Sequence, residues 1–75
     1  MADVTVDAKG LNCPLPILRA KKALKDVPAG GVLEVLATDP GSAADFEAYC
    51  STTGNTLMQP SNNNGVYRYL IKNTA

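Results

Sequence analysis

Residues 12–16 read NCPLP, and residues 17–25 continue with ILRAKKALK. This stretch is the most informative one for the fold, because it starts a helix a few residues after a short half-buried strand. Proline is favoured at the first helical position, where its missing N–H would have no intrahelical partner, so Pro14 predicts a helix start. Pro16 is tolerated in the same turn for the same reason. We expect a stiff first turn with Cys13 at or beside the N-cap.

Strands and helices alternate outward from this stretch. Apolar and polar residues alternate before residue 10 and after residue 31, which is the period of half-buried strands, whereas the helical stretches place their apolar residues three or four positions apart. The pattern predicts strands at residues 4–9, 32–38, 55–59 and 66–72, helices at residues 14–27 and 42–52, and a turn at residues 61–65. Because the chain shows no repeat and no internal boundary, we expect residues 1–75 to form a single domain.

The second helix has two candidate N-caps. Asp39 stands before Pro40, and Ser42 stands three residues before Asp45 in the manner of a capping box. Asp39 is most simply a cap, although a carboxylate at a helix start could also face a partner. We interpret Cys50 as a core residue, because it belongs to the apolar stripe of this helix, which comprises Ala43, Phe46, Tyr49 and Cys50.

The element order βαβαββ predicts an α/β two-layer sandwich. Two right-handed crossovers that run in the same sense along a sheet leave both helices on one face, so we expect a four-stranded mixed sheet with two helices on one face. The opposite face of the sheet is then partly exposed. Either Val66 and Leu70 or Tyr67 and Tyr69 must point toward it, and we favour an ordinary half-apolar face over a partner surface.

Composition and charge narrow the function classes. The chain has 75 residues, 45% of them hydrophobic, and a formal net charge of zero, which is ordinary globular composition in a body too small for a deep active site. With three tyrosines, one phenylalanine and no net positive charge, direct nucleic-acid binding is not expected. The N-terminal residues lack a basic region and a long apolar run, so we expect no signal peptide, no membrane span, a cytoplasmic location and reduced cysteines.

Cys13 is the residue best placed for chemistry. The sequence has no histidine and no Cys-x-x-Cys pair, which excludes His-based triads and leaves no set of zinc ligands, so neither a metal nor a cofactor is expected. A thiol at the positive end of a helix dipole, followed by four cations on that helix, should have a lowered pKa. Such a nucleophile, without a base to activate it, suits a carrier that takes sulfane sulfur from one protein and hands it to another. The competing interpretation is a small buried hydrophobic residue.

The sequence resembles the TusA/SirA-like sulfur-carrier family over nearly its whole length. The family's Cys-Pro-x-Pro motif stands here as Cys13-Pro14-Leu15-Pro16. Four further segments are similar to the family: GLN at residues 10–12, DP at residues 39–40, YC at residues 49–50 and YRYLIK at residues 67–72.

This resemblance implies a βαβαββ two-layer fold and a persulfide carried on Cys13. It implies that Pro14 and Pro16 shape the turn around the thiol, and we expect Arg19 and Lys22 to contact a partner. The donor would be a cysteine desulfurase or a rhodanese-like sulfurtransferase, and the acceptor a sulfur-relay protein of the Tus or Dsr type. The sulfur would go either to 2-thiouridine at the tRNA wobble position or into cytoplasmic sulfur oxidation. We expect the carrier to be a monomer.

A different class of function also fits these residues. In a non-catalytic interaction or regulatory module, the basic first helix and the exposed sheet face would matter, and Cys13→Ser would be silent. The sequence also does not decide whether a sulfur carrier of this kind turns over as an enzyme or only carries the group.

Overall fold

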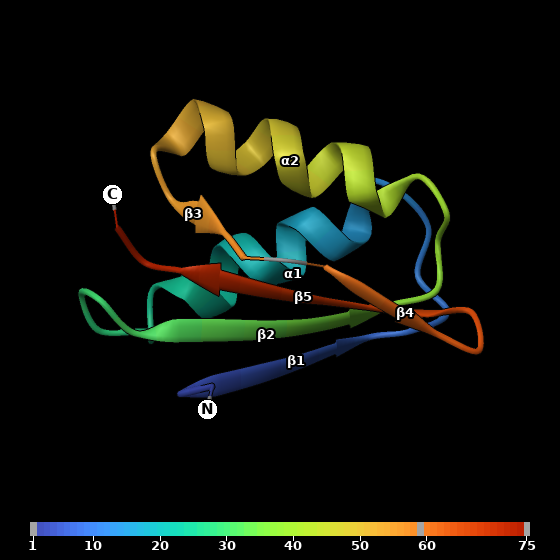
Figure 1. Cartoon of the computed structure of the whole chain (residues 1–75), viewed down its shortest axis with the longest axis horizontal. Helices are drawn as coiled ribbons and strands as arrows, with labels where there is room; N and C mark the ends of the chain where they lie inside the picture. The colour runs from blue at the N-terminus through green and yellow to red at the C-terminus, as the bar shows by residue number, and fades with distance from the viewer. Residues whose placement is uncertain (1, 59, 75) are drawn as a thin grey trace.

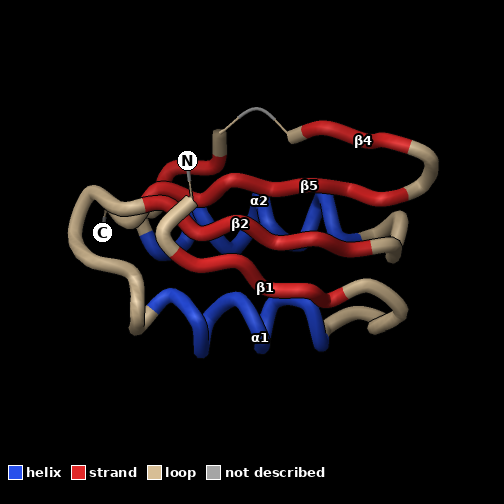
Figure 2. Tube along the Cα trace, turned by 90° about the horizontal axis from the view of Figure 1, so that it is seen from below, coloured by secondary structure: helices blue, strands red, loops and turns tan. Residues whose placement is uncertain are grey.

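The computed structural model describes residues 2–58 and 60–74. Both helices lie on one face of a mixed sheet of five strands, as Figure 1 and Figure 2 show, which confirms the predicted two-layer arrangement. The elements in chain order are β1 (Val4–Ala8), α1 (Leu15–Leu24), β2 (Val32–Ala37), α2 (Ser42–Thr53), β3 (Thr56–Leu57), β4 (Ser61–Asn63) and β5 (Val66–Lys72).

The sheet has one strand more than predicted. Its order is β1-β2-β5-β3, with β1 and β2 parallel, β2 and β5 antiparallel, and β4 also paired with β5. Residues 61–63, which were predicted to belong to a turn, form β4 because the reversal needs only Asn64 and Gly65. Both of these residues have positive φ values, 53° and 82°, as a two-residue Asn-Gly hairpin requires. β3 and β4 therefore pair with different ends of β5 along the same edge.

The core fills the space between the sheet and the helices. Leu33, Val35 and Ala37 of β2 are fully buried, as their alternation with polar or half-exposed residues predicts. Tyr69 and Ile71 of β5 point to the same face and are also fully buried. This settles which residues of β5 face outward: Val66 and Leu70 lie on the opposite, half-exposed face.

The helix α1 is shorter than the predicted span of residues 14–27. Pro14 is its N-cap rather than its first helical residue, so Pro16 occupies the second helical position. At the other end, the N–H groups of Asp26 and Val27 donate to the carbonyls three residues earlier in the chain. This is the 3₁₀ pattern, so the α-helix ends before Pro28. Val27 nevertheless stays buried at the end of the predicted apolar stripe.

The start of α2 differs from both predicted caps, because Gly41 is the N-cap and Ser42 is the first helical residue. The Ser42 hydroxyl is buried, donates to the Asp39 carbonyl at 2.7 Å and lies 2.7 Å from the Tyr69 hydroxyl. Ala43, predicted to belong to the buried stripe, is exposed in its place. The end of α2 agrees with the predicted role of Gly54, whose φ of +85° closes the helix in the left-handed conformation.

The outer face of the sheet carries a short polar network. Glu34 of β2 accepts hydrogen bonds from the Thr5 hydroxyl and the Arg68 guanidinium on the two neighbouring strands. The Arg68 hydrogen bond is the main cause that lowers the pKa of Glu34 below its ordinary value. No helix among the described residues is long and apolar enough to cross a bilayer.

Candidate functional site

The candidate site lies where two loops meet at one end of the sheet. Cys13 belongs to the loop between β1 and α1, whereas Asp39 and Asp45 belong to the β2–α2 loop and the first turn of α2. Because β1 and β2 are parallel neighbours, the loops that follow their carboxyl ends emerge at the same edge of the sheet. The Cys13 sulfur and one carboxylate oxygen of each aspartate consequently lie within 4.8 Å of one another.

Asp39 ties the two loops together. Its Oδ2 accepts a hydrogen bond from the Cys13 backbone N–H at 2.9 Å, and its Oδ1 accepts one from the Gly41 N–H at 3.1 Å. The second bond closes the turn that leads into α2. Asp39 is therefore not the helix N-cap that the sequence predicts, because Gly41 takes that position. The first bond, which the sequence did not predict, fixes the backbone of the residue that carries the thiol.

The Cys13 turn is held from its other side as well. The Leu15 N–H donates to the Asn12 carbonyl at 2.8 Å, and the Leu18 N–H donates to the Pro14 carbonyl at 3.1 Å. Pro16 is fully buried beneath this turn, and the Cys13–Pro14 peptide bond is cis. The thiol itself is on an exposed residue, which rules out the interpretation of Cys13 as a buried hydrophobic residue.

The electrostatic environment of the thiol is opposite to the predicted one. Hydrogen bonding to the Asp45 carboxylate, followed by partial desolvation and by the negative charges of Asp45 and Asp39, raises the pKa of Cys13. The first turn of α1 also has few free N–H groups with which to stabilise a thiolate. Pro16 has none, and the Leu15 N–H is already bonded within the turn. The prediction of a lowered pKa was therefore wrong.

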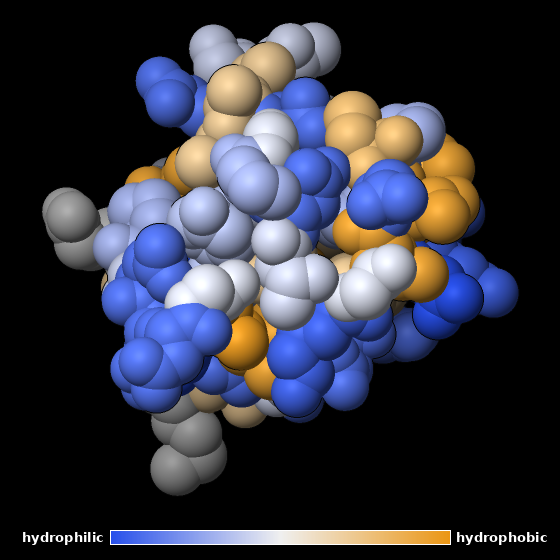
Figure 3. All heavy atoms as spheres, turned by 90° about the vertical axis from the view of Figure 1, so that its right-hand side faces the viewer, coloured by the Kyte–Doolittle hydropathy of each residue, from blue (hydrophilic) through white to orange (hydrophobic). Residues whose placement is uncertain are grey.

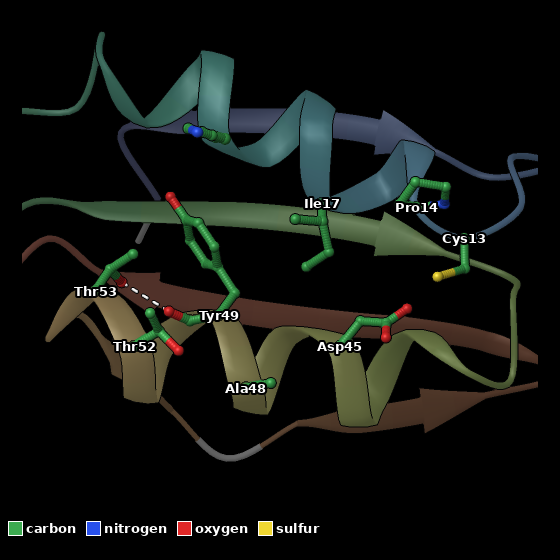
Figure 4. Close-up of a pocket in the computed structure, with 9 residues that line it drawn as sticks. Cys13, Pro14, Ile17, Asp45, Ala48, Tyr49, Thr52 and Thr53 are labelled. Atoms are coloured by element: carbon green, nitrogen blue, oxygen red, sulfur yellow. Dashed lines mark hydrogen bonds between the residues drawn. The ribbon is translucent and has the colours of Figure 1, made fainter.

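A groove of about 510 Å³ runs from the thiol between the two helices. Figure 4 shows Cys13 and Asp45 facing each other at one end of this groove, with Tyr49 farther along α2. Its lining residues are mostly apolar and come from both helices: Cys13, Pro14, Ile17, Lys21, Asp45, Ala48, Tyr49, Thr52 and Thr53. Neither the groove nor the position of Asp45 within it was predicted from the sequence, although two helices on one face of a sheet must lie side by side.

The two cations predicted to contact a partner lie outside this groove. Arg19 and Lys22 are exposed, and helical spacing places them on the same face of α1 as Leu15 and Leu18. These two leucines are 44% and 54% exposed, which is unusual for large apolar side chains. Figure 3 shows apolar surface at the end of the molecule where the two loops emerge, beside polar groups. We call Leu15, Leu18, Arg19 and Lys22 the α1 stripe.

Cys13, Asp39 and Asp45 are also the one set of clustered potential metal ligands in the described part of the chain. Both oxygens of Asp39 already accept backbone N–H groups, so this carboxylate has a structural role that does not need a cation. The second cysteine does not belong to this cluster. Cys50 is buried in the core, as predicted, and burial raises the pKa of its thiol.

Comparison with known proteins identifies the architecture first. It is similar to the crystal structure of a SirA-like protein from Desulfitobacterium hafniense, with a TM-score of 0.80 and 36% sequence identity, covering 92% of this chain and 95% of that chain. The sequence model of the family described as sulfurtransferase TusA matches residues 4–73. The chain belongs to the TusA family of sulfur carriers, which confirms the family resemblance found in the sequence.

Individual relatives agree over nearly their full lengths. A sulfur carrier protein TusA from Allochromatium vinosum is 56% identical over 70 residues, which cover 93% of this chain and 92% of the relative. A second sulfur carrier protein TusA, from Pseudomonas entomophila, is 41% identical over 73 residues, which cover 97% and 91% of the two chains.

Proposed function

We propose that this protein carries sulfane sulfur as a persulfide on Cys13. The observation that carries the proposal is the position of the thiol, which is exposed at the end of an open groove on a loop whose backbone is fixed by Asp39. A carrier needs a nucleophilic sulfur that other proteins can reach and that keeps its place between encounters. Pro14 and Pro16 serve that requirement by stiffening the turn on one side of the thiol.

The proposed chemistry is two successive thiol–persulfide exchanges. In loading, the Cys13 sulfur bonds to the terminal sulfur of a donor persulfide, and the electron pair of the broken S–S bond leaves on the donor's inner sulfur. In unloading, an acceptor thiolate bonds to the terminal sulfur, and the electron pair of that S–S bond returns to Cys13. Because each step exchanges one S–S bond for another, neither an oxidant nor a cofactor is consumed.

We further propose that the donor is a cysteine desulfurase or a rhodanese-like sulfurtransferase and that the acceptor is a sulfur-relay protein of the Tus or Dsr type. The α1 stripe supports protein partners, because exposed leucines beside the cations Arg19 and Lys22 fit an apolar surface with an acidic rim. The carrier would act as a single-domain monomer in the cytoplasm. Its sulfur would enter either tRNA 2-thiouridine formation or sulfur oxidation.

Sulfur loading is tested by incubating the reduced protein with a cysteine desulfurase and cysteine, or with a loaded rhodanese, and recording the intact mass. The wild type and Cys50→Ser should each gain one sulfur, and Cys13→Ser should gain none. Cys50→Ser is the matched control, because it removes the buried thiol and leaves the exposed one. If the wild type gains no sulfur from either donor, the carrier proposal fails and the interaction-module interpretation becomes the better one.

The role of the α1 stripe is tested by charge reversal in the double variant Arg19→Glu/Lys22→Glu. This variant should load more slowly from the protein donor that serves the wild type, because reversed charges oppose an acidic rim. The double variant Lys25→Glu/Lys72→Glu is the control for net charge, because it changes the charge by the same amount at two exposed cations outside the stripe. Equal slowing in the control would show that overall charge, rather than the stripe, governs docking.

A further inference from the structure

The sequence offers Cys13 as a nucleophile without a base, but the fold places a carboxylate beside it. We propose that Asp45 is a catalytic residue that accepts the Cys13 thiol proton while the thiol attacks the donor persulfide. This inference rests on the proposed function, because it assigns a role within the loading step. It goes beyond that function in naming a second reacting group on this chain.

The geometry separates Asp45 from the neighbouring Asp39. Both oxygens of Asp39 accept backbone N–H groups, so its carboxylate is committed to the loop structure. Within residues 2–58 and 60–74, none of the backbone N–H groups that donate to side chains donates to the Asp45 carboxylate, and neither ion pair involves it. Its side chain points from the first turn of α2 toward Cys13, as Figure 4 shows, and a carboxylate oxygen lies within 4.8 Å of the sulfur. Asp45 is therefore the carboxylate that is free to receive a proton.

The loading step then balances without an external base. The Asp45 carboxylate takes the proton from the Cys13 thiol as the sulfur bonds to the terminal sulfur of the donor persulfide. The donor's S–S bond breaks, and its electron pair stays on the donor's inner sulfur as a thiolate. Carboxylic acids are stronger acids than thiols, so the proton passes from Asp45 to that leaving thiolate or to water. The products are the Cys13 persulfide, the donor thiol and an ionised Asp45.

A base is useful here because the resting sulfur is a thiol rather than a thiolate. The two nearby carboxylates raise the pKa of Cys13, so few molecules hold a free thiolate at neutral pH. Transfer of the proton during the attack avoids placing a third negative charge in this cluster. The other titratable groups that line the groove are Lys21 and Tyr49. Lys21 lies in the last turn of α1, and Tyr49 lies four residues after Asp45 on α2.

The test measures the loading rate of Asp45→Asn with cysteine persulfide as the donor. This small donor needs no docking surface, so it reports chemistry at Cys13 alone, and intact mass distinguishes the persulfide from a mixed disulfide. Glu47→Gln is the matched control, because Glu47 is an exposed acid on α2 that lines a separate hollow. Asp45→Glu is the conservative variant that restores the carboxylate. Iodoacetamide alkylation as a function of pH gives the thiol pKa of each variant, and circular dichroism shows that each is folded.

A proton-accepting role and a purely electrostatic role predict opposite results. If Asp45 accepts the proton, Asp45→Asn should load about 100-fold more slowly near pH 6.5, the low end of general acid–base effects, although its thiol pKa is lower. The deficit should shrink as the pH rises and the thiolate forms without help. Glu47→Gln should match the wild type, and Asp45→Glu should recover part of the rate.

Two results would overturn the inference. If Asp45→Asn loads as fast as the wild type or faster, Asp45 only holds the thiol protonated and takes no part in the attack. If it loads more slowly by the same factor at every pH, Asp45 positions the loop without moving a proton. Either result leaves the sulfur-carrier proposal intact, because that proposal depends on whether the wild type gains sulfur and Cys13→Ser does not.

Discussion

Replacement of Asp39 by asparagine would test how the Cys13 loop is held. The asparagine oxygen can still accept the Gly41 N–H, but the amide NH₂ that takes the place of Oδ2 cannot accept the Cys13 N–H. The variant therefore removes one bond between the two loops and keeps the turn before α2. Asp39→Ala removes both bonds and serves as the comparison.

The magnitude follows from the type and exposure of the lost bonds. A hydrogen bond to a charged group contributes about 1.5–3 kcal/mol when buried, and this one lies between a half-buried aspartate and an exposed cysteine, so Asp39→Asn should cost about 1 kcal/mol. Loss of the turn-closing bond should bring the cost of Asp39→Ala to about 2 kcal/mol. In a domain of this size, each 1 kcal/mol lowers Tm by about 4–8 °C.

Urea denaturation followed by circular dichroism measures both costs, and hydrogen exchange reports the bond directly. The Cys13 amide should exchange about fivefold faster in Asp39→Asn if its protection falls by about 1 kcal/mol. Removal of one nearby negative charge should also lower the thiol pKa from its raised value. If Asp39→Asn matches the wild type in both stability and Cys13 exchange, Asp39 does not hold this loop and the argument for a pre-positioned thiol fails.

Three further predictions concern the parts of the fold that support this site. Tyr69→Phe deletes the buried bond to Ser42 and should cost about 1 kcal/mol by urea denaturation; an unchanged midpoint would show that the bond contributes nothing. Cys50→Ser buries a more polar group in the core and should cost about 1–2 kcal/mol, whereas equal stability would mean that water reaches this position. The lowered pKa of Glu34 means that its pair with Arg68 stabilises the fold above the ordinary glutamate pKa and is lost as pH falls through the folded-state pKa. Arg68→Gln should accordingly cost more stability at pH 7 than at pH 3, and an equal cost at both would exclude the ion pair as its source.

The sequence was most reliable where a single local pattern determines the structure. Alternation in residues 32–38 and 66–72 correctly located β2 and β5, and the left-handed glycine at residue 54 closed α2 as predicted. The errors lie where local patterns compete. Residues 61–63 resemble a turn by composition, but the sheet edge of β5 offers them hydrogen-bond partners, so they form β4. Ser42 resembles an N-cap, but its side chain is buried in the core, where it forms a hydrogen bond with the Tyr69 hydroxyl.

The sequence alone determined that Cys13 is the candidate carrier thiol. Cys13 precedes two prolines at a helix start, and the chain has no histidine. The reactivity of a thiol and the preference of proline for a helix start depend only on these residues and their neighbours, so the sequence is enough to predict them. The state of that thiol was decided only by the tertiary structure. Parallel pairing of β1 and β2 brings Asp39 and Asp45, which lie 26 and 32 positions after Cys13 in the chain, close to the thiol. Hydrogen bonding to Asp45 and the negative charges of both aspartates raise the pKa of Cys13. Electrostatic interaction depends on distance in space, so no local pattern around Cys13 could predict the raised pKa of its thiol.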